Sequence, residues 1–201
     1  IAQDIDALQV IVKSGNPFVA RGDTVRITNI RWKSIRNLHG DGLMLQPTRG
    51  VPRNDLAIIV IPDADQTPEM LCGISEGLPP AQQYALRLAE SGCRVFVPSI
   101  ISRHYEARNG RAKMTSREFA YRSAYELGRH LIGYEIQKIL ALLDECDRQS
   151  EGEETRYAVM GWGEGGMLAL YAAALDERID VACVSGYFDS RQDIWREPIS
   201  R

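Results

Sequence analysis

The residues that could do chemistry are concentrated in the glycine-rich segment 161–166, which reads Gly-Trp-Gly-Glu-Gly-Gly. A short strand-like run, 157–160, precedes this segment, and a helical run, 167–175, follows it. A strand, a glycine turn and a helix in this order bring the first free N–H groups of the helix, and the positive end of its dipole, to one point. The sequence therefore predicts a site that stabilises negative charge, either as an oxyanion hole or as a phosphate cradle.

Three interpretations fit the same six residues. The spacing Gly161-x-Gly163-x-x-Gly166 matches the dinucleotide-binding fingerprint, in which glycines allow a tight turn and close approach to a pyrophosphate. The spacing Gly161-x-Gly163-x-Gly165 matches a G-x-S-x-G nucleophile elbow with glycine in the place of the serine. The third interpretation is a structural turn that binds nothing. These residues alone leave all three open.

Composition excludes some partners. The chain has 201 residues and a net charge of −3, which gives no electrostatic reason to expect a nucleic-acid partner. No apolar run approaches the roughly 18 residues that span a bilayer, so we expect no membrane partner. The four cysteines show no C-x-x-C spacing and no neighbouring histidine, so we expect no metal and no cofactor.

Both ends of the chain look cut, because it starts at Ile1 without a leader and ends after a polar run. We therefore expect a fragment of a longer protein, in which residues 1–23 form an N-terminal extension and residues 24–201 form a partial domain. A soluble protein is expected, and both cytoplasmic and exported locations stay open.

Hydrophobic periodicity predicts an α/β fold. Residues 24–35 alternate as a half-exposed strand, 39–42 form a hairpin turn, and 43–47 return as the second strand. Buried strands are predicted at 56–61, 94–98 and 179–185, and a short helix at 81–91 makes the first two of them a parallel βαβ unit. A basic insertion at about 100–115 and one long helix, 116–147, complete the pattern, and a kink is expected at Gly133.

The position of the glycine segment favours the elbow over the dinucleotide fingerprint. A dinucleotide-binding domain opens with its glycines on the first strand and carries an acidic residue about twenty residues later. Here the glycines follow about the fifth strand, and 181–185 contains no acidic residue.

The same order of elements resembles the α/β-hydrolase superfamily. Residues 56–65 resemble its third strand with the oxyanion loop, 92–98 its fourth strand, and 157–170 its fifth strand with the elbow and helix, while 174–180 resembles the approach to the sixth strand. Within this superfamily, residues 40–195 are most similar to bacterial dienelactone-hydrolase-like and acetyl-xylan-esterase-like proteins. The resemblance implies a mostly parallel sheet with flanking helices and an N-terminal antiparallel hairpin, truncated after about the sixth strand.

The resemblance also implies a set of site residues. It places Gly163 at the nucleophile, where a glycine has no side chain to attack with. The backbone N–H of Glu164 would form one half of the oxyanion hole, and the backbone at Asp63 or Ala64 the other. The Glu164 carboxylate is a possible substitute nucleophile, although a helix N-terminus also favours glutamate for its charge alone.

The remaining members of a catalytic triad are harder to place. Asp189 is the only candidate for the acid. The family's histidine follows the last strand of the sheet, whereas all three histidines of this chain precede the elbow: His39, His104 and His130. Trp162 and Tyr187 either line the pocket or pack in the core. Arg103, Arg108 and Arg111 either bind an anionic substrate or lie in a solvated basic loop.

Three functions follow as hypotheses. The first is an ester hydrolase of carbohydrate or small-acid esters, whose catalytic competence is in doubt because position 163 is glycine. The alternative is a non-catalytic pseudo-hydrolase that binds a ligand or partner in the old cleft. The third is a dinucleotide-binding protein. The expected partner in the first case is a small-molecule ester or a carbohydrate-derived ligand.

Overall fold

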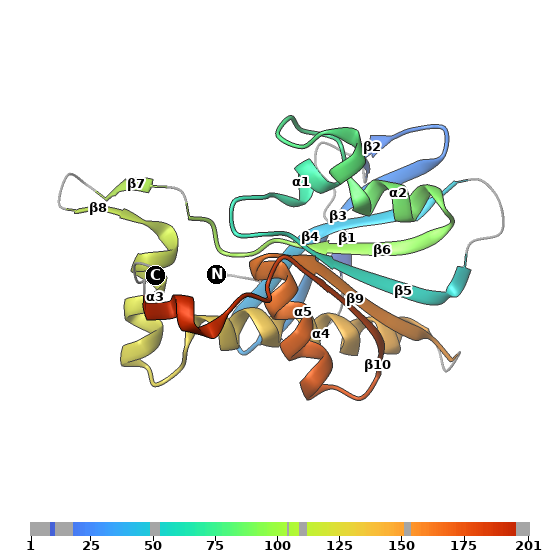
Figure 1. Ribbon diagram of the computed structural model, residues 1–201. Coiled ribbons are helices and arrows are strands. Elements are labelled where there is room, and N and C mark those ends of the chain that lie inside the picture. The colour runs from blue at the N-terminus through green and yellow to red at the C-terminus, as the bar shows by residue number, and fades with distance from the viewer. Residues whose placement is uncertain are drawn as a thin grey trace.

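The computed structural model describes residues 9–10, 18–48, 53–103, 105–108, 112–150 and 154–195. Its centre is an eight-stranded sheet with the order β1-β3-β4-β6-β5-β9-β10, to which β2 adds by pairing with β3 (Figure 1). The strands of this sheet are β1 (Gln9–Val10), β2 (Phe18–Arg21), β3 (Val25–Ile35), β4 (Leu38–Pro47), β5 (Arg53–Ile61), β6 (Cys93–Pro98), β9 (Arg156–Trp162) and β10 (Ile179–Ser185).

The sheet is antiparallel at its N-terminal end and parallel elsewhere. Strands β6, β5, β9 and β10 are parallel neighbours, whereas β4 joins β6 in antiparallel orientation. The predicted βαβ unit is confirmed, because β5 and β6 pair in parallel and a helix connects them. Both short strands within the predicted N-terminal extension, β1 and β2, pair with β3.

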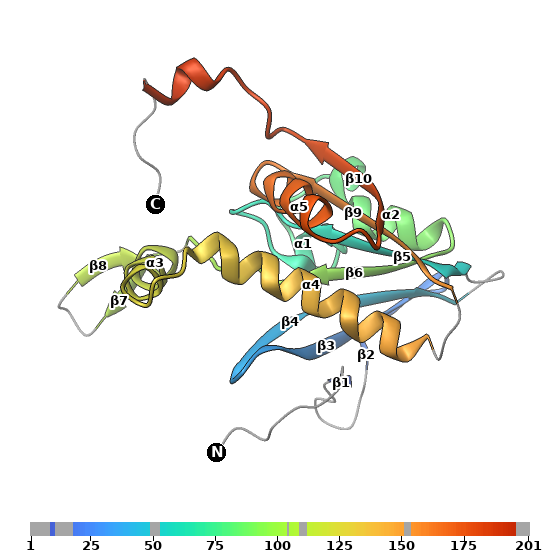
Figure 2. The same cartoon turned by 90° about the horizontal axis from the view of Figure 1, so that it is seen from below.

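Helices cover both faces of the sheet (Figures 1 and 2). One apolar cluster lies between the sheet and the two long helices α4 and α5, and a second lies under α1 and α2. The helical elements are α1 (Pro68–Leu71), α2 (Tyr84–Glu90), α3 (Ser116–Glu126), α4 (Leu131–Gln149) and α5 (Glu164–Leu175), with single 3-10 turns at Pro80–Gln82 and Arg191–Trp195. This is the predicted α/β architecture.

The expected insertion contributes a small hairpin. Strands β7 (Tyr105–Arg108) and β8 (Ala112–Thr115) pair in antiparallel orientation and lead directly into α3. Figure 1 shows this hairpin and α3 together as an arm beyond the end of the central sheet. His104 and Arg111 lie outside the described residues.

The predicted hairpin turn at 39–42 is wrong. The turn consists of Arg36 and Asn37, and β4 already begins at Leu38. Arg36 has a φ of 47°, which a tight two-residue connection requires. Gly40, which suggested the turn, instead lies in a strand against the indole of buried Trp32, where a Cβ atom would collide with the ring. Close packing explains this glycine better than turn chemistry does.

The predicted single helix over 116–147 is also wrong. The helix is broken into α3 and α4 between residues 126 and 131. Gly128 adopts a φ of 76° just after α3, and His130 caps α4 by accepting a hydrogen bond at Nδ1 from the N–H of Ile132. Gly133 lies inside the first turn of α4, so it is not the break.

Strand β10 is exposed, although its apolar sequence predicted burial. It stands at the end of the strand order, and its residues 180–183 are exposed, including Val181 at 59%. Cys183 is exposed for the same reason, whereas Cys72, Cys93 and Cys146 are buried free thiols.

The corner between α5 and β10 is held by one arginine. Arg178 makes ion pairs with Asp176 at 2.6 Å, with Asp147 at 2.6 Å and with Asp144 at 2.8 Å. The last two acceptors lie on α4, so the guanidinium fixes α4 against the end of α5. Its hydrogen bonds lower the pKa of the Asp176 carboxyl, more strongly than partial burial raises it.

We predict that Arg178→Gln lowers the free energy of unfolding at neutral pH by about 1–3 kcal/mol, because three carboxylates lose a charge-assisted partner. Since the pKa of Asp176 is lower in the folded than in the unfolded state, its contribution is present above the unfolded value of about 4 and is lost as pH falls through the folded value. Urea denaturation at several pH values should show the deficit of the variant shrinking as the solution becomes more acidic. A deficit that is constant down to strongly acid pH would contradict this.

Candidate active site

The glycine segment forms a sharp strand-to-helix turn. Strand β9 ends at Trp162, α5 begins at Glu164, and Gly163 stands between them with φ 56° and ψ −119°. The Gly163 N–H donates to the Ser185 carbonyl at 2.9 Å, and its own carbonyl accepts from the Met167 N–H at 3.1 Å. Glycine adopts this conformation without strain, whereas another residue there would be held in a strained conformation costing on the order of 1–3 kcal/mol.

The other glycines of the segment allow close packing rather than access for a ligand. A Cβ atom on Gly161 would collide with the backbone of α5, and one on Gly165 would lie 2.5 Å from the Pro62 carbonyl oxygen. A Cβ atom on Gly166 would lie 2.8 Å from the carbonyl oxygen of Ser185 on the next strand. The spacing that suggested a dinucleotide fingerprint thus serves the contact of α5 with β5, β9 and β10.

The side chain of Asp63 occupies the point where the helix N-terminus faces the loop after β5. Its Oδ1 accepts a hydrogen bond from the Glu164 N–H at 2.8 Å and another from the Ala64 N–H at 2.8 Å. The resemblance implied the N–H of Glu164 as one oxyanion donor and the backbone at Asp63 or Ala64 as the other. The sequence pointed to Asp63 only through its backbone, so the role of its carboxylate was missed.

Asp63 is held in place by its own loop. Its N–H donates to the Gln66 side chain at 3.2 Å, and its carbonyl accepts from the Gln66 N–H at 3.0 Å. The negative charge of Asp63 also acts on the neighbouring Tyr84. Burial in the first place, and the Asp63 charge in the second, raise the pKa of the Tyr84 hydroxyl to about 12.

The Glu164 side chain is buried in ion pairs. It is 7% exposed, and its Oε2 lies 2.8 Å from Nη2 of Arg103. Its Oε1 pairs with Nη1 of Arg117, a helix residue that is itself 9% exposed. The contact joins α3 to the elbow. Nothing in the sequence marked Arg117, because an arginine in a helix is normally solvated.

Asp189, His130 and His39 make local contacts in their own segments. The Asp189 side chain is exposed and caps its own chain by accepting from the Ser190 N–H at 2.7 Å. His130 caps α4, and His39 lies in strand β4 with a buried Nε2 that lacks a hydrogen-bond partner in the described part of the chain. His39 is therefore a strand residue rather than a turn residue.

Trp162 and Tyr187 lie beside the elbow. Trp162 is 53% exposed, and the backbone of Gly186 packs so closely on its indole that a Cβ atom there would lie 2.7 Å from the ring. The Tyr187 ring is half-buried and contacts Phe188 with 5.5 Å between the ring centres.

A cavity of about 240 Å³ lies between the loop after β5 and the segment after β6. Its wall is polar. The Arg103 Nε is buried there without a hydrogen-bond partner among the residues that the structure describes. The lining residues are Ala64, Asp65, Gln66, Thr67, Pro68, Glu69, Ser99, Ile100, Ser102 and Arg103.

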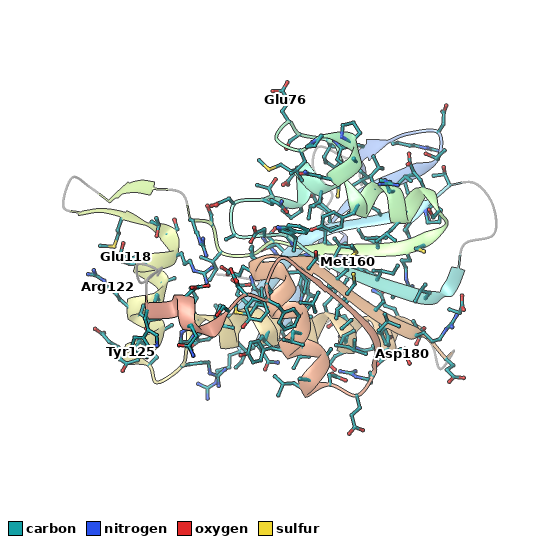
Figure 3. The ribbon with its side chains drawn as sticks, in the orientation of Figure 1. Glu76, Glu118, Arg122, Tyr125, Met160 and Asp180 are labelled. Carbon is teal, nitrogen blue, oxygen red and sulfur yellow. The ribbon has the colours of Figure 1, made fainter. Side chains whose placement is uncertain are left out.

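Among the residues that the structure describes, no three His, Cys, Asp or Glu side chains gather around one point where they could hold a metal ion. Among the helices described, none is long and apolar enough to span a membrane. Figure 3 shows the side chains over the same view, with Met160 on β9 close to the centre of the sheet.

The sheet order, the strand-turn-helix at Gly163 and the paired N–H groups define an α/β-hydrolase fold with its elbow. A family model described as the dienelactone hydrolase family matches residues 42–194. The chain therefore belongs to the dienelactone hydrolase family, as the resemblance implied.

Solved structures agree on the fold. A candidate acetyl xylan esterase from Bacteroides fragilis superposes with a TM-score of 0.65 at 18% identity, covering 89% of this chain and 47% of that chain. Acetyl xylan esterase 1 from Thermoanaerobacterium sp. gives 0.55 at 16% identity, covering 96% and 60%. A dienelactone hydrolase-like promiscuous phosphotriesterase from metagenomic libraries gives 0.52 at 17% identity, covering 85% and 64%. The chain thus spans less than two thirds of these structures. No curated protein matches it.

We predict that Glu164→Gln lowers the free energy of unfolding by about 3–5 kcal/mol, because it leaves two arginines without their buried carboxylate. Chemical denaturation should be compared with Arg156→Gln, which breaks the exposed pair with Asp55 and should cost less than about 1 kcal/mol. Equal effects of the two variants would show that the Glu164 pairs are not a structural anchor.

Proposed function

We propose that this member of the dienelactone hydrolase family binds a small molecule in its cleft without hydrolysing it through the elbow. The single observation that carries the proposal is Gly163. It has the conformation of a nucleophile elbow but no side chain that could form a covalent intermediate. The lineage we infer is that of hydrolases of carbohydrate or small-acid esters, because the similar structures include acetyl xylan esterases.

Glu164 is a poor substitute for the missing nucleophile. Both of its carboxylate oxygens are engaged by arginines, and the side chain is buried. A carboxylate whose two oxygens each accept a charge-assisted hydrogen bond is a weaker nucleophile toward a carbon atom. The residue therefore supports the elbow rather than the chemistry.

The dinucleotide alternative has little support. The glycines at 161, 165 and 166 pack against backbone, and the helix N–H group that would meet a phosphate already donates to the Asp63 carboxylate. A pyrophosphate would have to approach this negative charge directly, which is unfavourable.

The cavity beside the elbow suggests the class of ligand. Ser99, Thr67, Gln66 and Arg103, all with polar side chains, are among the residues that line it. A small polyhydroxylated molecule offers hydroxyl groups for hydrogen bonds at several positions. We therefore propose a carbohydrate-derived ligand, held by hydrogen bonds alone.

The catalytic half of this proposal is tested with an activated ester such as p-nitrophenyl acetate. We expect the protein and its Glu164→Gln variant to hydrolyse it no faster than buffer, without a burst of p-nitrophenol. Saturable hydrolysis that is lost in Glu164→Gln, in a variant that circular dichroism shows to be folded, would make Glu164 a catalytic residue and the protein an ester hydrolase. Saturable hydrolysis that persists in the variant would place a nucleophile elsewhere and would also contradict the proposal.

The binding half is tested by calorimetric titration with an acetylated xylo-oligosaccharide. We expect saturable binding to the protein and its loss in Ser99→Trp, because the indole would fill the cavity. Val181→Trp, on the exposed strand β10, is the matched control and should bind normally. Absence of binding to the unmodified protein, or equal binding by both variants, would contradict the assignment of this cavity.

A further inference from the structure

The oxyanion hole of this fold is filled by a side chain of the protein itself. Two backbone N–H groups, one at the start of α5 and one in the loop after β5, converge on a single oxygen atom, Oδ1 of Asp63. In a hydrolase this place must be empty in the resting enzyme, because the donors stabilise the oxygen of the substrate as it gains negative charge. In this chain they already hold a full negative charge.

Asp63 also fills the space that a nucleophile would need. An ideal Cβ atom on Gly163 would lie 2.5 Å from Oδ1 of Asp63, 2.6 Å from Oδ2 and 2.7 Å from Cγ. Real Cβ atoms do not approach other atoms so closely. The carboxylate in this position and a side chain at 163 therefore compete for the same space, and the absence of a side chain at 163 makes room for the carboxylate.

Backbone hydrogen bonds hold the loop that carries Asp63. Its loop is held by the two hydrogen bonds with Gln66, and Ala64 is buried. The N-terminus of α5 adds a favourable dipole for the negative charge. No other anion can reach the two N–H groups unless this carboxylate leaves.

We propose that Asp63 determines what the cleft accepts, because its carboxylate is a built-in ligand of the oxyanion hole. It excludes carbonyl oxygens and anions from the two N–H groups at the elbow and presents a hydrogen-bond acceptor there instead. A ligand must therefore place a donor, such as a hydroxyl group, over the elbow. The inference concerns the cleft of the proposed function, but it depends only on the occupation of the two N–H groups.

The experiment follows the backbone amides of Ala64 and Glu164 by 1H–15N NMR while sodium acetate is added. In the parent protein we expect no saturable shift at either amide. In Asp63→Ala, the emptied hole should give saturable shifts at both amides, and their hydrogen exchange should be about tenfold faster or more before acetate is added. Glu177→Ala removes a carboxylate from an exposed residue in the turn after α5 and should behave as the parent.

Two results would overturn the inference. The first is a saturable acetate shift at both amides in the parent, since the hole would then be open. The second is hydrogen exchange in Asp63→Ala that is as slow as in the parent, since the carboxylate would then not be the partner of these amides.

If Asp63→Ala does not fold, Asp63→Asn takes its place. The amide keeps the shape of the side chain but removes the charge, so exchange at both amides should again be faster, while acetate should still be excluded. Unchanged exchange in Asp63→Asn would contradict the inference. Hydrolysis of the activated ester by the parent would overturn the proposed function, whereas only the amide experiment overturns the occupation of the hole.

Discussion

The structure of the site depends on one carboxylate shared between two backbone N–H groups. Asp63 follows directly on strand β5, and its Oδ1 connects the loop after that strand to the first turn of α5. A charge-assisted hydrogen bond at a helix N-terminus is among the stronger polar contacts available to a chain of this kind. The carboxylate also takes up the space that a Cβ atom at position 163 would need, so the contact and the glycine at 163 depend on each other.

Glu164 provides a second carboxylate at the elbow, and it also connects segments that are far apart in the sequence. Glu164 uses its backbone N–H for Asp63 and its side chain for Arg103 and Arg117. Two buried or half-buried negative charges are thus balanced by two arginines and by the helix dipole, so the region is close to neutral. The pairs with Glu164 also connect the arm formed by β7, β8 and α3 to the centre of the sheet (Figure 1). The residues around the elbow therefore form a network of ion pairs and hydrogen bonds beside the cavity.

Much of the fold was predictable, because it follows from periodicity. The unbroken apolar run at 56–61 predicts a central strand, and the glycine segment at 161–166 predicts a strand-turn-helix with the correct ends within a few residues. The errors in the predicted fold concern a glycine that packs closely within a strand and a strand at the edge of the sheet. Gly40 suggests a turn although it packs on Trp32, and the sequence of β10 suggests burial although this strand ends the sheet. A sequence pattern predicts whether a segment is a strand or a helix better than it predicts which elements lie beside that segment.

The site was predictable only in its backbone. The elbow and the two donor positions followed from the strand order and the resemblance, because the geometry of a helix N-terminus is independent of side chains. The contact of the Asp63 side chain with Glu164 joins residues 101 positions apart, and the pair with Arg117 joins residues 47 apart. No local pattern encodes such contacts. An aspartate after a strand is as common in a solvated loop as in a hydrogen-bonded site.

The measurement that tests the central claim most directly is a double-mutant cycle on the free energy of unfolding, with Asp63→Ala and Gly163→Ala. If the carboxylate and position 163 exclude each other, Gly163→Ala should cost about 1–3 kcal/mol more in the parent than in the Asp63→Ala background, where only backbone strain remains. Costs that agree within about 0.5 kcal/mol in the two backgrounds would mean that the two positions are independent, and would contradict the mutual exclusion of the Asp63 carboxylate and a side chain at position 163.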